Sequence, residues 1–306
     1  MTNEGQAVRK AVFPAAGFGT RFLPATKAQP KEMLPIVDKP AIQYGIEEAL
    51  AAGLDDILVI TGRGKRAIED HFDRNPELEA AMERSGKHEL VDLVQQTADL
   101  VDLYFVRQKE QLGLGHAVLQ ARRHVGNAPF AVILGDDLIW SEEPAIGQLV
   151  RAYERYGAPV VAVERVPRDR ISSYGVVEIQ PEPLEPGVFR VRHLVEKPDP
   201  DSAPSDLGVV GRYVLVPEIF EMLATQGPGA KGEIQLTDAL ERLAQDGPLV
   251  AVEFEGVRYD TGDKLGYLKA QVDFALRRPE LREALTEFLR ERIQDRMPSG
   301  SGLRGR

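Results

Sequence analysis

Short apolar runs alternate with helix-like segments through the first half of the chain. Continuous apolar runs of about four to eight residues are typical of buried strands, whereas apolar residues at every third or fourth position indicate helices. Residues 40–52 show the helical pattern, with Ile42, Ile46 and Leu50 on one face and Gly53 at the end. The predicted strands are 10–15, 57–60, 103–106, 130–134 and 159–166, and the predicted helices are 40–52, most of 66–98, 114–124 and 145–156.

Strands separated by helices predict an α/β fold with a mainly parallel sheet that is covered by helices on both faces. Ligands of such sheets bind beyond the carboxyl ends of the strands. Three polar or glycine-containing segments follow predicted strands, at 15–21, 107–115 and 135–137. We therefore expect a ligand site to draw on these three segments.

The pattern changes between Tyr174 and Val216, where short apolar runs are separated by prolines and glycines. Such runs predict short strands, so we expect a mixed or antiparallel β-rich insertion beside the parallel sheet. Helical spacing returns at 217–223 and 235–244, and a strand-like run follows at 249–254. The α/β pattern therefore continues beyond the insertion.

The last part of the chain carries many charges of both signs. A helical pattern runs from Pro279 to about Gln294, and the glycines and serines that follow predict disorder. We divide the chain into one domain of residues 1–277, with a β-rich part at about 167–216, a C-terminal helix at 278–295 and a disordered tail at 296–306.

Composition narrows the class of function. The 306 residues carry 38 basic and 48 acidic side chains, a net charge of −10, which argues against nucleic-acid binding and against a polybasic membrane surface. No apolar run approaches the roughly 20 residues of a membrane span, and the polar segment 1–9 lacks the apolar core of a signal peptide. The absence of cysteine excludes disulfides and thiol nucleophiles. We therefore expect a soluble, cytoplasmic protein with neither nucleic-acid nor membrane partners.

A glycine-rich turn, Pro14-Ala-Ala-Gly-Phe-Gly-Thr-Arg21, follows the first predicted strand. Small residues let a backbone approach a ligand closely, and successive N–H groups bind anions. The dinucleotide fingerprint does not fit, because Phe22 stands where the third glycine belongs and no acidic residue ends the second strand. An NAD-dependent dehydrogenase is therefore disfavoured, and the Gly-Lys-Ser/Thr of a Walker loop is also missing.

The charge around this turn differs from that of the remaining chain. Residues 1–40 hold six basic and three acidic side chains, a net +3, which leaves −13 on the other residues. A basic loop on an acidic protein indicates a small polyanionic ligand such as a nucleoside triphosphate.

Several motifs together resemble the signature of sugar-1-phosphate nucleotidyltransferases, and within them the bacterial UTP–glucose-1-phosphate uridylyltransferases (UDP-glucose pyrophosphorylases). The resemblance runs from about Lys10 to Arg277. The motifs are Gly17-Phe-Gly-Thr-Arg-Phe-Leu-Pro24, Pro30-Lys-Glu-Met-Leu-Pro35, Lys39-Pro40, Arg107-Gln-Lys-Glu-Gln-Leu-Gly-Leu-Gly-His-Ala117, Glu196-Lys-Pro198, Val210-Gly-Arg-Tyr213, Gly232-Glu-Ile-Gln-Leu-Thr-Asp238 and Tyr259-Asp-Thr-Gly262.

The resemblance implies a Rossmann-like, GT-A-like fold in which residues 1–277 are the catalytic domain and about 167–216 bind the sugar. It implies transfer of a uridylyl group from UTP to α-D-glucose 1-phosphate, giving UDP-glucose and pyrophosphate, with Mg²⁺ as cofactor. A phosphate monoester has a second pKa of about 6, so the attacking oxygen is already anionic and needs no general base. It also implies a homo-oligomer, a dimer or tetramer, with the helix at 278–295 as a possible subunit contact.

By this resemblance, cations hold the phosphates and carboxylates hold the metal. Arg21 and Lys31 would bind the triphosphate and the leaving pyrophosphate, because guanidinium and ammonium groups suit phosphate oxygens. Asp136, directly after a buried strand, and Asp260 would share Mg²⁺ with the phosphates. Which of Asp136 and Asp137 faces the metal stays open, although the resemblance favours Asp136.

The same resemblance supplies the remaining site residues. Glu196 and Lys197 would bind the glucose hydroxyls and the sugar phosphate, and the backbone of Gly175 would meet the sugar. Lys197 would also be catalytic, together with Arg21 and Lys31. Glu32 would either contact the base or brace its loop, and His116 is interpreted as a capping or packing residue. The nucleotide-binding set is Ala15, Ala16, Gly17, Gly19, Thr20, Glu32, Gln108 and Gly113, in which the Gln108 amide and Gly113 would read the pyrimidine edge.

Two alternatives to this function remain open. A glucose-1-phosphate thymidylyltransferase is one, because Gln108 and Gly113 could accept either pyrimidine. The other is a non-catalytic regulatory paralogue that binds sugar nucleotides. The presence of both Asp136 and Asp260 argues against it, because a pure regulator needs no pair of metal carboxylates.

Overall fold

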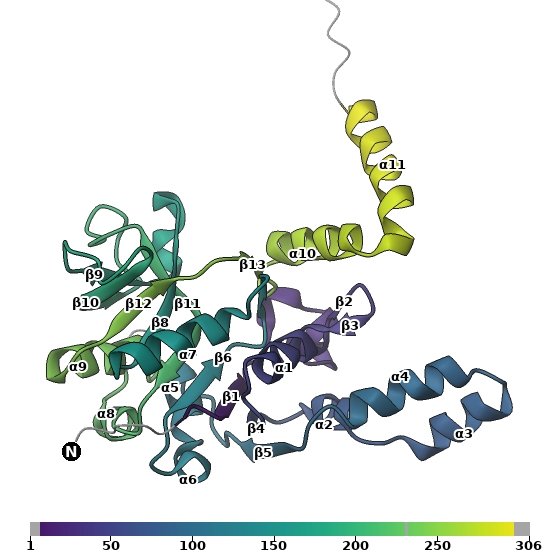
Figure 1. Cartoon of the computed structure of the whole chain (residues 1–306), viewed down its shortest axis with the longest axis horizontal. Coiled ribbons are helices and arrows are strands. Elements are labelled where there is room, and N and C mark those ends of the chain that lie inside the picture. The colour runs from purple at the N-terminus through teal and green to yellow at the C-terminus, as the bar shows by residue number, and fades with distance from the viewer. Residues whose placement is uncertain (1–6, 230–231, 297–306) are drawn as a thin grey trace, which may run out of the picture.

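A nine-stranded mixed sheet lies at the centre of the computed structural model, which describes residues 7–229 and 232–296 (Figure 1). Strands β11 and β10 run opposite to the other seven. The predicted α/β fold class is confirmed. From one edge to the other, the strands are β5 (Leu103–Arg107), β4 (Asp56–Thr61), β1 (Lys10–Ala15), β6 (Phe130–Ile133), β11 (Leu207–Leu215), β8 (Val160–Arg165), β12 (Val250–Glu253), β10 (Val188–Glu196) and β9 (Gly175–Ile179).

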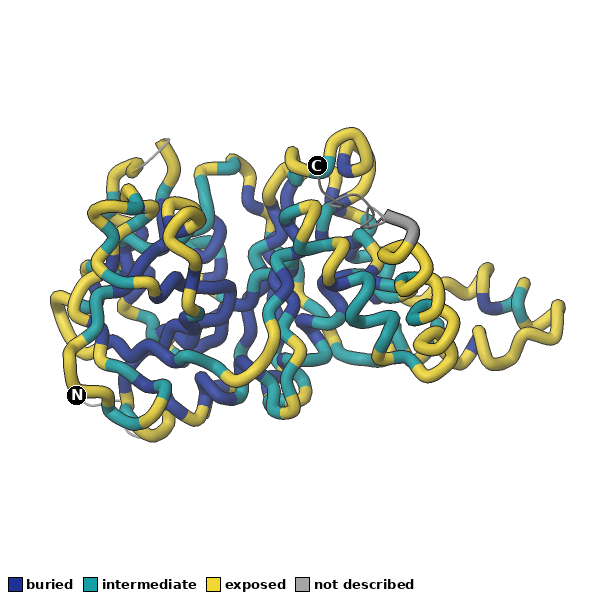
Figure 2. The backbone as a smooth tube through the Cα atoms, turned by 90° about the horizontal axis from the view of Figure 1, so that it is seen from above, coloured by how far each residue is buried: buried dark blue, intermediate teal, exposed yellow. Residues whose placement is uncertain are grey.

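Helices cover both faces of the sheet, because alternate strand residues point to opposite sides. Phe13 packs in the cluster under α1 (Ala41–Ala51) and α7 (Ala145–Tyr156). Its neighbour Val12 packs in the opposite cluster. Figure 2 shows the buried residues concentrated along the sheet. The second face is covered by α5 (Leu114–Leu119), α6 (Arg122–Val125), α8 (Ile219–Thr225) and α9 (Leu236–Asp246).

The sequence pattern predicts that the β-rich stretch lies beside the parallel sheet, and this is only partly correct. Strand β11 sits inside the sheet, antiparallel to both β6 and β8, and all of its residues are buried. Only β9 and β10 form an antiparallel pair at the edge. The short, proline-bounded runs predict strands but do not say which neighbours they choose, since pairing is decided by burial on both faces.

Two short ribbons, which the sequence does not predict, complete the architecture. Strand β7 (Asp137–Trp140) pairs with β13 (Val257–Asp260), and β2 (Pro35–Ile36) pairs with β3 (Lys39–Pro40). Four-residue and two-residue strands give too little alternation to be recognised from the sequence. Short 3₁₀ turns occur at η1 (Thr20–Phe22), η2 (Ala25–Lys27), η3 (Lys31–Met33) and η4 (Arg168–Ser173).

Two groups of helices project from the sheet unit (Figure 1). The predicted helical stretch 66–98 forms α2 (Arg66–Phe72), α3 (Pro76–Arg84) and α4 (His88–Ala98). At the C-terminal end, α10 (Lys264–Arg277) is an unpredicted helix, and α11 (Pro279–Arg296) follows where a charged helix is predicted. The predicted disordered tail lies, from residue 297 on, outside the described residues. Within the described part, none of the helices is both long and apolar enough to cross a membrane.

Candidate active site

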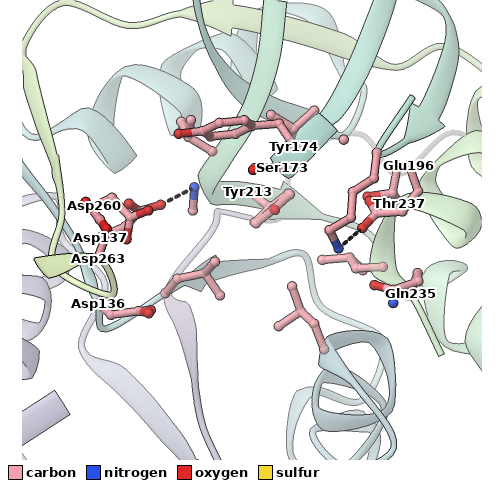
Figure 3. A pocket seen from close by; sticks show the side chains of 18 of the residues that line it. Asp136, Asp137, Ser173, Tyr174, Glu196, Tyr213, Gln235, Thr237, Asp260 and Asp263 are labelled. Carbon is pink, nitrogen blue, oxygen red and sulfur yellow. Dashed lines mark hydrogen bonds and ion pairs between the residues drawn. The ribbon is translucent and has the colours of Figure 1, made fainter. Parts of the chain in front are cut away.

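A cavity of about 680 Å³ opens beyond the carboxyl end of β6 and beside β11 (Figure 3). Side chains from both halves of the chain line it, including Tyr174, Tyr213 and Thr237. Parallel strands place their carboxyl ends at one edge of a sheet, which is where the sequence analysis expects the site. Of the predicted site residues, the cavity is lined by Arg21, Lys31, Asp136, Gly175, Glu196, Lys197 and Asp260.

Asp136 and Asp260 meet around Gly262 at one end of this cavity. A Cβ atom at Gly262 would lie 2.6 Å from Asp136 Oδ2 and 3.0 Å from Asp260 Oδ1, so only glycine fits between the carboxylates. Thr261 fixes the loop that carries Asp136, since its N–H and its hydroxyl donate to the Asp136 carbonyl at 2.8 and 2.7 Å. The Asp260 carboxylate accepts a hydrogen bond from the Gly262 N–H at 2.9 Å.

Cations surround the two carboxylates. Lys31 forms an ion pair with Asp136, and Arg21 Nη1 lies 3.4 Å from the Gly262 carbonyl. Burial opposes ionisation of Asp136 most strongly, but the charge and hydrogen bond of Lys31, a backbone hydrogen bond and the charge of Arg21 together lower the pKa of this carboxyl. Burial together with the charges of Asp137 and Asp136 raises the pKa of Asp260. This end of the cavity therefore holds closely coupled opposite charges.

Both carboxylate oxygens of Asp137 accept hydrogen bonds from other strands. Its Oδ2 accepts from the Gly211 N–H at 2.9 Å, and its Oδ1 accepts from Arg258 Nε at 2.7 Å. The buried Arg258 guanidinium also donates to Glu164 at 2.5 Å and to the Tyr174 hydroxyl at 3.3 Å. Asp137 thus ties β7 to β11 and β13, while Asp136 is the neighbour whose carboxylate borders Asp260.

A bulge in β11 makes this arrangement possible. The β11 register shifts between Val210 and Tyr213, which frees the Gly211 N–H from the ladder. A Cβ at Gly211 would lie only 2.5 Å from Asp137 Oδ2, so the approach requires glycine. Next to it, the fully buried Arg212 donates to Glu48 at 2.9 Å and packs the interior, whereas Gly211 and Tyr213 line the cavity.

The donor set at Asp136 and Asp260 fits a small divalent cation. Within residues 7–229 and 232–296, no group of three or more His, Cys, Asp or Glu side chains is arranged to hold a metal ion. Mg²⁺, however, is usually bound by one or two carboxylates together with substrate phosphates and water. Two carboxylate oxygens on either side of one glycine provide the protein share of such a site.

The opposite end of the cavity is built on the β9–β10 hairpin and α9. Glu196 ends β10, and Lys197 Nζ donates to its carboxylate at 2.5 Å (Figure 3). Lys197 has a φ of 47°, which is unusual for a residue with a side chain, and its N–H donates to the Tyr174 carbonyl at 2.9 Å. A Cβ at Gly175 would lie 2.8 Å from Thr237 Oγ1 and 3.3 Å from Glu196 Oε2. Polar groups of β9, β10 and α9 can therefore form hydrogen bonds with a ligand of the size of a sugar at this end of the cavity.

The remaining predicted residues do not line this cavity. The glycine turn, which includes Ala15, Ala16, Gly17, Gly19 and Thr20, follows β1, and Gln111 Nε2 donates to the Ala16 carbonyl at 2.8 Å. This bond joins the turn to the loop after β5. The buried Gln108 begins that loop, and Gly113, with a φ of 101°, ends it directly before Leu114, which lines the cavity.

Glu32 lies beneath the site and not on its surface. It is 1% exposed, and its Oε2 accepts from Lys65 Nζ at 2.8 Å. Burial raises the pKa of Glu32 against the opposing charges of Lys31 and Lys65. Of the two interpretations of Glu32, the brace agrees with this contact.

Sequence reasoning misses four residues that organise the site: Lys65, Gln111, Arg258 and Thr261. Lys65 and Arg258 are buried cations, which are rare unless paired, but a sequence does not reveal burial. Gln111 lies inside a quoted motif, so the motif itself is the signal that could have found it. Thr261 stands between Asp260 and Gly262 in another such motif.

Comparisons with known proteins show the family of the chain. The family model for nucleotidyl transferases matches residues 10–276 of the chain. The UTP–glucose-1-phosphate uridylyltransferase of Staphylococcus haemolyticus (strain JCSC1435) is 52% identical over 284 residues, covering 93% of this chain and 98% of that protein.

Solved structures give the same relationship. A UDP-glucose pyrophosphorylase in complex with UDP-glucose is 44% identical, with a TM-score of 0.79, covering 89% of this chain and 100% of that one. The UTP-bound UGPase of Acinetobacter baumannii is 40% identical, with a TM-score of 0.86, covering 93% of this chain and 99% of that one. The chain therefore belongs to the nucleotidyl transferase family, in its group of UTP–glucose-1-phosphate uridylyltransferases.

Proposed function

We propose that this chain transfers a uridylyl group from UTP to α-D-glucose 1-phosphate, forming UDP-glucose and releasing pyrophosphate. Relatives that carry the name of this activity, and related structures with UDP-glucose or UTP bound, support the choice of substrates. One observation in the chain itself carries the proposal. A single cavity joins two carboxylates and two cations at one end to the Glu196–Lys197 pair at the other.

In this reaction a phosphate oxygen of glucose 1-phosphate attacks the α-phosphorus of UTP. The new phosphorus–oxygen bond replaces the bond to the β-phosphate, and pyrophosphate leaves with the electron pair. Because the attacking oxygen is already anionic near neutral pH, no residue has to remove a proton. Catalysis then consists of positioning two polyanions and stabilising the charge between them.

Arg21 and Lys31 supply the cations for the triphosphate. In the structure Lys31 is paired with Asp136, so each group neutralises the charge of the other. When a cation neutralises Asp136, Lys31 Nζ becomes available to donate to a phosphate oxygen. Arg21 approaches the same end of the cavity from η1, next to Gly262.

Asp136 and Asp260 would hold Mg²⁺, the cofactor that we propose. When bound, it supplies positive charge that lowers the repulsion between the substrate phosphates. The fit rests on the two carboxylate oxygens at Gly262 and on the preference of Mg²⁺ for oxygen ligands shared with phosphates.

We place the glucose moiety at the other end of the cavity. Glu196 accepts hydrogen bonds from sugar hydroxyls, and Lys197 donates to the sugar phosphate once it exchanges its bond with Glu196. The backbone at Gly175 approaches the sugar because no side chain intervenes there. The base lies on the glycine turn from Ala15 to Thr20, with Gln108 and Gly113 at its edge.

The proposal is tested by measuring pyrophosphate release from UTP and glucose 1-phosphate with Mg²⁺, at enzyme concentrations suited to a turnover of about 10 s⁻¹. Parallel reactions replace UTP by dTTP, replace glucose 1-phosphate by mannose 1-phosphate, or add excess EDTA. We expect turnover with UTP and glucose 1-phosphate that EDTA abolishes. No turnover, or a clear preference for dTTP or another sugar phosphate, would refute this substrate assignment.

We also propose that the chain is cytoplasmic and forms a homo-oligomer, a dimer or tetramer, in which α11 contacts another subunit. Exposed apolar side chains on that helix, Phe288 at 49% and Ile293 at 59%, support such a contact. Light scattering of the full chain, compared with a chain ending at Arg278, tests it. A monomeric full chain would contradict the proposal.

A further inference from the structure

The ring of His116 lies against the side chain that we assign to base recognition. Gln108 is 4% exposed, and its Nε2 lies 2.9 Å from His116 Nδ1. We infer that His116 is a positioning residue, which fixes the orientation of the Gln108 amide so that the site accepts uracil and rejects cytosine. This inference rests on the proposed function, because it concerns the nucleotide of that reaction. The contact replaces the capping or packing role expected from the sequence.

A backbone carbonyl sets the orientation of the Gln108 amide. The same Nε2 lies 3.2 Å from the Gly113 carbonyl oxygen. A carbonyl oxygen can only accept, so the amide group that faces it must be the NH₂ group. His116 Nδ1 faces this NH₂ group as well and must therefore act as an acceptor. The proton of the neutral imidazole then resides on Nε2.

The second ring nitrogen faces a competing donor. Gln120 Nε2 lies 3.2 Å from His116 Nε2 and 3.1 Å from the His116 carbonyl. Only one of the two ring nitrogens can accept a hydrogen bond in the neutral ring. The contact with Gln108 is shorter and Gln108 is buried, whereas the partly exposed Gln120 retains its carbonyl partner. A lost hydrogen bond costs more at the buried Gln108 amide than at the partly exposed Gln120 amide, which favours acceptance at Nδ1.

Because His116 and the Gly113 carbonyl hold the NH₂ group of Gln108, its carbonyl oxygen remains available to accept a hydrogen bond from a ligand. Neither Gln108 Oε1 nor the Gly113 N–H has a hydrogen-bond partner among residues 7–229 and 232–296. The backbone around Gly113 is fixed, since Ile234 N–H donates to Leu112 O at 2.7 Å and Gly115 N–H donates to Ile234 O at 2.9 Å. The loop therefore offers an acceptor, Gln108 Oε1, and a donor, the Gly113 N–H, which are linked by the contact between Gln108 Nε2 and the Gly113 carbonyl.

This pair matches one type of pyrimidine edge. Uracil offers an N3–H donor next to a carbonyl acceptor, which fits Gln108 Oε1 and the Gly113 N–H. Cytosine offers an unprotonated N3, which would face the Gln108 oxygen without a hydrogen between them. Cytosine would fit only if the Gln108 amide turned over, and His116 together with the Gly113 carbonyl opposes that rotation. Thymine shares the edge of uracil, so this pair does not separate UTP from dTTP.

The test compares substitutions at His116 that differ in their acceptor. His116→Leu removes the acceptor while keeping a branched side chain of similar width. His116→Asn keeps an acceptor, because Asn Oδ1 is bonded to Cγ as His Nδ1 is. His116→Ala is a second acceptor-free variant, and Gln120→Met is the matched control at the other ring nitrogen. For each variant, kcat and KM are measured with UTP and CTP. Calorimetry measures nucleotide binding without sugar phosphate.

We expect His116→Leu and His116→Ala to lower the UTP-to-CTP ratio of kcat/KM by about tenfold, mainly through a higher KM for UTP. His116→Asn and Gln120→Met should stay within about threefold of the wild type. An unchanged ratio in both acceptor-free variants, or an equal loss with both nucleotides, would overturn the inference. If the wild type prefers UTP in calorimetry but forms no UDP-glucose, the proposed function fails while the inference is still decided by the binding ratios.

Discussion

The two ends of the cavity are built from different kinds of contact. At the phosphate end, Arg21 and Lys31 come from the loop after β1, whereas Asp136 and Asp260 come from two segments far along the chain. Each lies close to a group of opposite charge or to Gly262. At the sugar end, the β9–β10 hairpin supplies Glu196 and its sequence neighbour Lys197, with α9 close by.

From this difference we expect the phosphate end to act mainly on the reaction rate and the sugar end to act mainly on the binding of the sugar phosphate. A group at the phosphate end acts through charge, so removing one charge leaves its partners unbalanced in a poorly solvated place. A group at the sugar end acts through hydrogen bonds to a neutral ring and one phosphate, so its loss should weaken one substrate. We therefore expect mutations at the phosphate end to lower kcat or stability, and mutations at the sugar end to raise KM for glucose 1-phosphate.

The largest expected effect is that of Asp136→Asn on turnover. Removing a carboxylate from the proposed metal site should lower kcat by about 10³-fold, because the charge that it anchors acts on the transition state. Steady-state pyrophosphate release and a thermal melt of the same sample check this. Folding should be retained, since Asp136 lies at the cavity and, among residues 7–229 and 232–296, its carboxylate pairs only with Lys31. Unchanged turnover would show that the metal assignment is wrong.

Asp137→Asn should have its main effect on stability. Asp137 is 7% exposed and pairs with the buried Arg258, so the substitution leaves a buried guanidinium with one carboxylate fewer. We expect a loss of about 3 kcal/mol in the free energy of unfolding, measured by urea titration.

Asp55→Asn is the matched control, because it breaks an exposed ion pair with Arg9 and should leave the urea midpoint unchanged. If Asp137→Asn behaves like Asp55→Asn, then the Asp137–Arg258 pair does not hold this end of the site together.

Lys197→Met tests the sugar end. The substitution keeps most of the side-chain length but removes the ammonium group, so KM for glucose 1-phosphate should rise about tenfold or more. KM for UTP should stay within about twofold, because Arg21 and Lys31 remain. Initial rates with each substrate varied in turn measure both constants. An equal rise in both KM values would erase the distinction between the two ends.

The smallest expected effect comes from Gly175→Ala. The new Cβ would lie 2.8 Å from Thr237 Oγ1, so Thr237 must shift, and KM for glucose 1-phosphate should rise about fivefold. Adding Thr237→Ala to the same chain removes the clash and should restore part of the loss. The double variant thus separates crowding from a direct role of Thr237. No recovery in the double variant would indicate that the backbone itself has moved.

The parts of the fold that follow local periodicity were predictable from the sequence. The buried strands β1, β4 and β6 read as continuous apolar runs, and α7 reads as an amphipathic helix. The position of β11 inside the sheet was not predictable, because its antiparallel pairing with β6 and β8 depends on contacts distant in sequence.

The candidate site divides in the same way. Motifs located Asp260 and Lys197, the end of a buried strand located Asp136, and these three residues line one cavity. The partners that hold them could not be found from the sequence, because Arg258 and Lys65 matter through side chains that are only 9% and 7% exposed and not through a local pattern. The choice between Asp136 and Asp137 also needed geometry, since only the bulge at Gly211 shows where Asp137 is engaged.

The most direct test of the central claim is to locate a metal ion. Crystals grown with UTP and Mn²⁺, a substitute for Mg²⁺ with an anomalous signal, show where the ion binds. The account predicts one anomalous peak that contacts the carboxylates of both Asp136 and Asp260. A peak coordinated by Asp137, or an ion bound to the nucleotide without either Asp136 or Asp260, would contradict it.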